Sequence, residues 1–232
     1  MPLKGLFSKD FLDEYKSGKR IFSDINLQYA EICDVDLTDL VVKDSRLFFV
    51  NFRNCKLANS KFLNCEIFWG GFYNTLLENA VFEKSKIDLT WFEDARFKNT
   101  KILNSKISWT AILNSVMAEL DTSTSTLFKV FTDPTQATPE DLEEFMRMLG
   151  PVLDSLDISI KARVREGLIS DVARHGVEVR ATGSDNSQYK KNEVNYNRSQ
   201  AGYGLAMSNL SSTIISAYNN EHPYKLKKDK YQ

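Results

Sequence analysis

The residues that most often carry catalysis or metal binding are few in this chain and far apart. The cysteines are Cys33, Cys55 and Cys65, and the histidines are His175 and His222. These positions match no zinc-ligand spacing, and a nucleophilic triad needs a histidine that lies near a serine or a cysteine. We therefore predict no catalytic residue, no metal site and no cofactor, and we expect a protein that is not an enzyme.

Composition and charge exclude further classes of function. Of 232 residues, 42% are hydrophobic, and 30 Lys and Arg stand against 31 Asp and Glu, so the net charge of -1 supplies no general attraction to nucleic acid or anionic membrane. No glycine-rich phosphate loop is present. Three cysteines do not make a disulfide framework, and the N-terminal MPLKGLFSKDF lacks the apolar segment of a signal peptide. We therefore expect a cytoplasmic protein that does not associate with membranes.

The elements that position any functional residue follow a repeat of five residues. From position 22 onward, every fifth residue is large and apolar, while the residue two positions earlier is mostly small and the residue two positions later is often Asn or Asp. Neither a helix of 3.6 residues per turn nor a strand of period two keeps such columns on one side. A chain that turns a corner every five residues does, with Asn or Asp at the corners. The large column consists of Phe22, Leu27, Ile32, Leu37, Val42, Leu47, Phe52, Leu57, Phe62, Ile67, Phe72, Leu77, Phe82, Ile87, Phe92, Phe97, Ile102, Ile107, Ile112 and Met117.

The repeat resembles that of the pentapeptide repeat family, in segments such as AEICD, VNFRN, SKFLN, ARFKN, TKILN and TAILN. The resemblance covers roughly residues 20 to 119. It implies an all-β solenoid, a right-handed quadrilateral β-helix of about five coils, which at about 4.8 Å per layer makes a rod of roughly 24 Å. Cys55 and Cys65 fall in the small inward column, so we expect buried, inert thiols, with Cys33 at the surface.

The segments outside the repeat have other patterns. We predict a short N-terminal capping helix within residues 1–19, with Ser8 as its N-cap and Phe11, Leu12 and Tyr15 on one face. Residues 20–120 form the β-helix, and residues 121–137 form a closing segment and linker. Residues 138–180 form a helical C-terminal appendage, and residues 181–232 a flexible linker, a short helix and a basic tail. The apolar face of the first appended helix consists of Leu142, Phe145, Met146 and Leu149.

One edge of the predicted solenoid differs from the others. With four sides of five residues, positions twenty apart share an edge, and one edge carries large apolar residues where the others mostly carry Asn or Asp. Either the appended helix covers this edge, or the edge binds another protein or a second copy of the chain, since exposed aromatic clusters are typical interface anchors. The predicted partner-binding residues are Tyr29, Phe49, Trp69, Leu89 and Trp109, with Phe48 and Phe68 beside them and Arg46, Lys86 and Lys106 at the rim.

The main functional hypothesis is a non-enzymatic scaffold or adaptor that displays a rigid β-helix face to a partner protein, with a homodimer also open. The resemblance suggests one alternative, because some pentapeptide repeat proteins mimic a DNA duplex and regulate type II topoisomerases, as in quinolone resistance. A mimic needs a long acidic strip, however, and basic and acidic residues are nearly balanced along this repeat. A second alternative is binding of single-stranded nucleic acid by base stacking, but Glu66 and Asp88 interrupt the basic run.

Overall fold

The computed structural model describes residues 3–133 and the isolated positions 136, 138, 140, 141, 144, 147, 148, 151 and 215. The chain divides into two compact units, Met1–Asp133 and Pro134–Gln232. The fold described below is that of the first unit. The predicted apolar face of the appended helix and both histidines lie outside the described residues.

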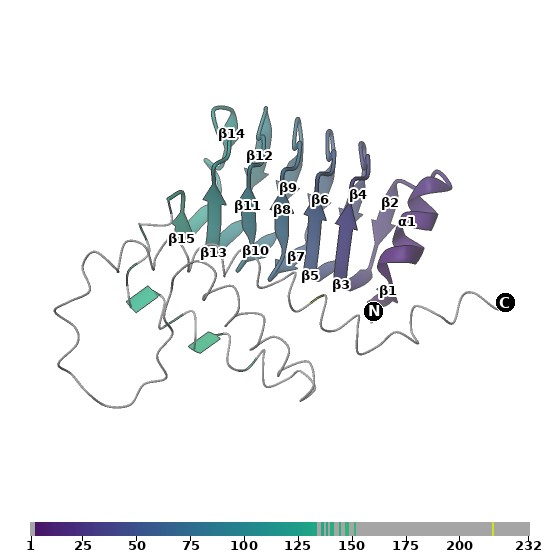
Figure 1. Cartoon of the computed structure of the whole chain (residues 1–232), viewed down its shortest axis with the longest axis horizontal. Coiled ribbons are helices and arrows are strands. Elements are labelled where there is room, and N and C mark those ends of the chain that lie inside the picture. Colours follow the sequence, from purple (N-terminus) through teal and green to yellow (C-terminus); the bar gives the residue numbers. More distant parts are fainter. Residues whose placement is uncertain are drawn as a thin grey trace, which may run out of the picture. The chain divides into compact units, whose positions relative to one another are not determined.

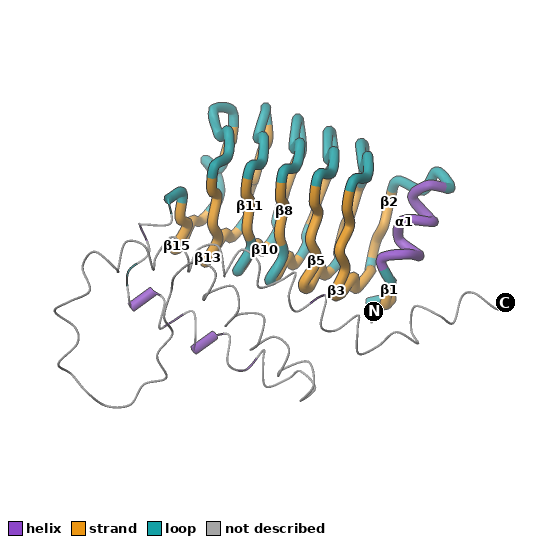
Figure 2. The backbone as a smooth tube through the Cα atoms, in the orientation of Figure 1, coloured by secondary structure: helices purple, strands orange, loops and turns teal. Residues whose placement is uncertain are grey.

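The first unit is a parallel β-solenoid, as the repeat predicts (Figure 1). Most of its strands are short because the chain turns a corner at their end, and successive turns stack side by side (Figure 2). One side is a six-stranded sheet made of β2 (Ile21–Ser23), β4 (Val41–Lys43), β6 (Lys61–Leu63), β9 (Val81–Glu83), β12 (Thr100–Leu103) and β14 (Leu120–Asp121).

Two further sides form one continuous sheet that folds around a corner. Its strands are β1 (Lys4–Leu6), β3 (Ile25–Cys33), β5 (Arg46–Arg53), β7 (Glu66–Phe68), β8 (Gly71–Tyr73), β10 (Lys86–Asp88), β11 (Trp91–Glu93), β13 (Lys106–Leu113) and β15 (Thr126–Phe131). The fourth side is held by isolated parallel bridges that join Asp36, Lys56, Leu76, Arg96 and Val116 in turn.

Pairing between turns keeps a register of twenty residues. Lys86 of β10 pairs with Glu66 of β7 on one edge and with Lys106 of β13 on the other. Because each turn has four corners, this register places every fourth pentapeptide on the same side. The positions that share an edge in the sequence therefore also share it in space.

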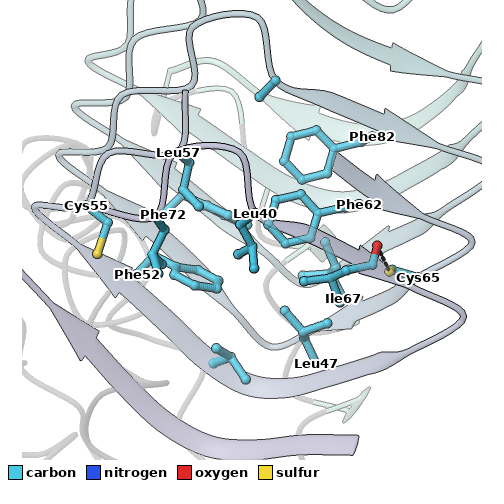
Figure 3. Close-up of a cluster of buried hydrophobic side chains, with 14 of the residues drawn as sticks. Leu40, Leu47, Phe52, Cys55, Leu57, Phe62, Cys65, Ile67, Phe72 and Phe82 are labelled. Atoms are coloured by element: carbon cyan, nitrogen blue, oxygen red, sulfur yellow. Dashed lines mark hydrogen bonds between the residues drawn. The ribbon is translucent and has the colours of Figure 1, made fainter. Parts of the chain in front are cut away.

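The large column lies inside the coil (Figure 3). Phenylalanine rings stack from turn to turn: the centroids of Phe62 and Phe82 are 4.8 Å apart, and those of Phe72 and Phe92 are also 4.8 Å apart. Cys55 and Cys65 are buried in the small column, whereas Cys33 is exposed.

The N-terminal end of the coil is closed by α1 (Ser8–Lys16). Phe11 is buried against Phe22, with ring centroids 4.5 Å apart, and the Tyr15 hydroxyl donates a hydrogen bond to the carbonyl of Thr38 at 2.6 Å. The N-cap is Phe7, without a side-chain hydrogen bond, rather than the predicted Ser8, which is the first helical residue. Packing on the coil end thus supports this helix more than capping does.

The other end of the coil extends further than predicted. β14 and β15 lie in the segment that was expected to close the coil, yet β15 pairs with β13 in the same register, with Thr126 opposite Lys106. The backbone ladder continues here although the side-chain pattern ends, because parallel pairing depends on backbone groups. The inward positions Met117 and Leu127 are accordingly 37% and 50% exposed.

Candidate functional site

At every fifth residue from Asp24 to Asn114, the corner of the coil has a left-handed backbone conformation. Three edges supply it mostly with Asn or Asp, which tolerate positive φ, and these side chains bond along the edge: Asn59 Nδ2 donates to Asp39 Oδ1 at 3.0 Å, and Asn79 Nδ2 donates to Asn59 Oδ1 at 3.2 Å. The fourth edge uses large apolar residues. We call this set the aromatic ladder: Tyr29, Phe49, Trp69, Leu89 and Trp109, with φ of 50°, 53°, 55°, 50° and 50°.

The rungs of the aromatic ladder stack along the edge. The Phe49 ring lies between Tyr29 and Trp69, with centroid separations of 5.5 and 5.8 Å. At the far end, Trp109 contacts Phe128 edge to face at 6.3 Å. These side chains lie outside the cluster that forms the coil interior. The ladder is therefore a second apolar assembly on the outer side of the coil.

Most rungs are not displayed to water. Phe49, Trp69 and Leu89 are at most 1% exposed and Trp109 is 8% exposed, while Tyr29 is half-buried. Among the described residues, Phe49 stacks on Tyr29 and Trp69, and a second aromatic column meets Phe49 and Trp69 from the side. The predicted site residues Phe49, Trp69, Leu89 and Trp109 are thus buried in this structure, and their part in partner binding stays a prediction.

The second aromatic column is the accessible part. Phe48 and Phe68 are half-buried and stack on each other with centroids 5.9 Å apart. Phe48 meets Phe49 edge to face at 4.7 Å, and Phe68 meets Trp69 at 6.3 Å. We define a candidate docking face, called the docking face below, as Tyr29, Arg46, Phe48, Glu66, Phe68, Lys86 and Lys106.

Charges of both signs border this column. Arg46 Nε donates to Glu66 Oε2 at 2.8 Å, across two adjacent turns. The Lys86 ammonium lies 3.4 Å from Asp88 Oδ2 and 5.4 Å from the centroid of Phe68. The rim is therefore a row of paired charges, which differs from a sustained basic strip. The register explains why: Glu66 falls directly between Arg46 and Lys86.

A cluster on the other side of the aromatic ladder was not singled out in the sequence. Asn51 Nδ2 donates to Glu31 Oε2 at 3.0 Å, Arg53 Nε donates to Glu31 Oε1, and the Arg53 guanidinium lies 3.9 Å from the Tyr73 ring centroid. Gly71 leaves space for that ring, since a Cβ at this position would stand 2.0 Å from Tyr73 Cε2. Listing outward residues at steps of twenty would have revealed the column.

The thiols of the described residues are shifted toward the neutral form, and no metal centre is assembled among these residues. Burial raises the pKa of the Cys55 thiol to about 11 and that of the Cys65 thiol to about 12. Burial, with a smaller contribution from Glu31, also raises the pKa of Cys33. Within the described part of the chain, no three His, Cys, Asp or Glu side chains come close enough to share a metal ion. No helix there is both long and apolar enough to span a bilayer.

No family model and no curated protein matches the chain. Among solved structures, it is similar to the pentapeptide repeat protein Rfr23 from the cyanobacterium Cyanothece 51142, with 12% identity, coverage of 53% of this chain and 97% of that one, and a TM-score of 0.31. It is also similar to HetL, a pentapeptide repeat protein involved in heterocyst differentiation regulation from Nostoc sp. strain PCC 7120, with 19% identity, coverage of 56% and 61%, and a TM-score of 0.29.

A third similar structure is full-length QnrB1, a plasmid-mediated fluoroquinolone resistance protein, with 12% identity, coverage of 65% of this chain and 99% of that one, and a TM-score of 0.23. At these sequence identities and TM-scores, the similarities do not indicate a function for this chain. The chain resembles pentapeptide repeat proteins, as predicted, in its own five-residue columns and in the parallel coil that they form.

Proposed function

We propose that this pentapeptide-repeat solenoid is a non-enzymatic scaffold that holds a protein partner on the docking face. The observation that carries the proposal is the conformational cost of the aromatic ladder. The left-handed backbone conformation raises the free energy of a residue with a Cβ by about 1–2 kcal/mol, and Asn and Asp tolerate this conformation better than Trp, Phe or Leu. Strain of this kind is often found where function requires it.

The anatomy of the surface supports an interface. Phe48 and Phe68 form an apolar centre, and the pairs Arg46–Glu66 and Lys86–Asp88 form a polar rim. Protein interfaces have this arrangement, with aromatic residues enriched at the centre and charged residues at the edge. The buried rungs Phe49 and Trp69 hold the accessible rings in place from beneath.

The solenoid would act by rigid display. Backbone amides on the docking side are bonded to neighbouring turns, as in the bonds from Glu66 N to the Ser45 carbonyl at 2.9 Å and from Lys86 N to the Cys65 carbonyl at 2.8 Å. A surface fixed in this way loses little conformational entropy when a partner binds. Affinity then depends on complementarity at the two rings and on the charges around them.

The test is affinity capture from cells of the source organism with the full-length chain. We expect a partner protein to bind the wild type and a Leu76→Ser control, which alters an exposed residue on another side, and to be lost with Phe48→Ser/Phe68→Ser. Circular dichroism establishes that all three proteins are folded. Equal recovery by all three would contradict the proposed site.

The same experiment addresses the two alternatives. A captured type II topoisomerase whose supercoiling activity is altered by the wild type would favour the DNA-mimic alternative. Recovery of nuclease-sensitive nucleic acid would favour the single-strand alternative. The paired charges Arg46–Glu66 and Lys86–Asp88 favour neither, because a mimic needs a sustained acidic strip and phosphate binding needs a sustained basic one.

A further inference from the structure

We infer that the element bound by the docking face is an amphipathic α-helix of the partner protein, lying along the axis of the coil stack. The inference rests on the proposed scaffold function and specifies the partner of the same site. Four features of the docking face carry it: its backbone hydrogen bonding, the orientation of its rings, their spacing, and the order of its charges.

Backbone pairing on this side leaves no place for an added strand. β7 lies between β5 and β10, with Phe68 opposite Phe48 on one edge and opposite Asp88 on the other. Strand addition requires a free edge, where main-chain groups supply the affinity. A partner here binds through side chains and must satisfy its own backbone groups, which a helix does within itself.

The orientation of the rings argues against stacked bases. Phe48 and Phe68 are inclined to each other by 18°, so one face of each ring is turned toward the other. Lys86 Nζ lies over the Phe68 ring as well. A base stacks on an open ring face. What a partner can reach is the ring edges, which suit aliphatic side chains.

The spacing of the rings matches a helix. Their centroids are 5.9 Å apart along the stack. A helix advances about 5.4 Å per turn, and side chains at i and i+4 have Cβ atoms about 5–6 Å apart. Two apolar residues one turn apart therefore face Phe48 and Phe68 in the same order. Tyr29 lies at the corner one coil step before Phe49, and its ring centroid is 6.0 Å from that of Phe48, so Tyr29 extends the contact by another turn.

The order of the charged residues along the docking face predicts a third contact residue in the partner helix. Beyond Phe68, the next two turns carry Lys86 and then Lys106 in register. Lys86 already pairs with Asp88. Two coil steps of about 4.8 Å nearly equal two helical turns of about 5.4 Å. The structure therefore assigns an acidic residue to the partner helix about two turns beyond its apolar pair, opposite Lys106.

The test uses two displayed peptide libraries of equal length, one of helix-forming sequences and one of proline-rich extended sequences. Each is selected on the full-length wild type and counter-selected on Phe48→Ser/Phe68→Ser. We expect helical binders with apolar residues at i and i+4 and an acidic residue near i+11. Their affinity should fall at least tenfold on the counter-selection variant and severalfold on Lys106→Glu, and should be unchanged on the Leu76→Ser control.

The outcomes separate the two levels of the proposal. If only the proline-rich library gives binders that depend on Phe48 and Phe68, the docking face is supported as a binding site, but the inference that it binds a helix is wrong. Helical binders without the i, i+4 pair would also overturn the helix inference. If neither library gives binders that depend on the two rings, the docking face itself fails, and the proposed function fails with it.

Discussion

Gly71 and Tyr73 share the outer face of β8, and the tyrosine ring occupies the space where any other residue at position 71 would place its Cβ. The distance from that Cβ to Tyr73 Cε2 would be 2.0 Å. The Tyr73 ring also contacts the Arg53 guanidinium, whose central carbon lies 3.9 Å from the ring centroid. One glycine thus permits a cation–π pair between adjacent turns.

Gly71→Ala should therefore destabilise the protein. The Tyr73 ring is buried, so it must leave its position at a cost typical of overpacking, about 1–3 kcal/mol. Urea unfolding followed by circular dichroism measures the difference. The control is Gly5→Ala in β1, where an added Cβ meets nothing within 4 Å. Equal stability of the two variants would show that the ring moves freely.

Trp69→Asn tests the cost of the aromatic ladder. The substitution removes a buried ring that stacks on Phe49 at 5.8 Å, but it places at this corner a residue that prefers the left-handed conformation. We expect a loss of about 1–3 kcal/mol, smaller than the about 3–5 kcal/mol typical of Phe→Ala in a core. Chemical denaturation of Trp69→Asn beside Phe72→Ala, which empties the coil interior, makes the comparison. A loss at Trp69 as large as that at Phe72 would mean that this rung is core and not a support for a surface.

Asn59→Ala separates two contributions of a corner residue. Asn59 donates to Asp39 and accepts from Asn79, and it has a φ of 58°. Loss of both exposed hydrogen bonds and of the left-handed preference should cost about 1–2 kcal/mol in the free energy of unfolding. Asn59→Gly loses the same bonds but keeps the conformation. Thermal unfolding should therefore place Asn59→Gly between the wild type and Asn59→Ala, and the reverse order would contradict the argument.

The thiols should differ in reactivity. Burial holds Cys55 and Cys65 as neutral thiols, with pKa values of about 11 and 12, so neither supplies a thiolate near pH 8. Cys33 is exposed. A disulfide reagent at pH 8 should label Cys33 in the folded protein and all three cysteines after denaturation. Rapid labelling of Cys65 in the folded state would show that the coil opens locally.

The same shifts predict a loss of stability in alkali. A thiol whose pKa is raised by folding contributes stability that is fully present below its unfolded pKa, near 8.5, and is lost as the pH rises toward its folded pKa. The contribution of Cys65 should therefore decline between about pH 8.5 and pH 12. Cys65→Ala should flatten this part of the stability profile, measured by denaturation at a series of pH values. An unchanged slope would assign the alkaline loss to other groups.

Much of the fold can be predicted from the sequence because each five-residue unit specifies its own corner and its own inward residue. A corner every five residues can be inferred from Asn and Asp positions such as Asn59 and Asn79, and an inward column from residues such as Phe72 and Phe82. The twenty-residue register then follows from four corners, and with it the edge that carries Tyr29, Phe49 and Trp69. The further turn formed by β14 and β15 was missed, since its backbone pairs without the side-chain pattern.

The sequence by itself determined the parallel coil and the five positions of the aromatic ladder, because both depend on spacing along the chain. The tertiary structure decided which rings are buried and which remain accessible, how Glu66 pairs with Arg46, and where the Tyr73 ring lies over Gly71. These properties depend on contacts between residues one turn apart and on side-chain orientation. Phe48 and Phe49 are identical neighbours within β5, yet Phe49 stands at the corner with a φ of 53° and is buried, whereas Phe48 is half-buried and remains within reach of a partner.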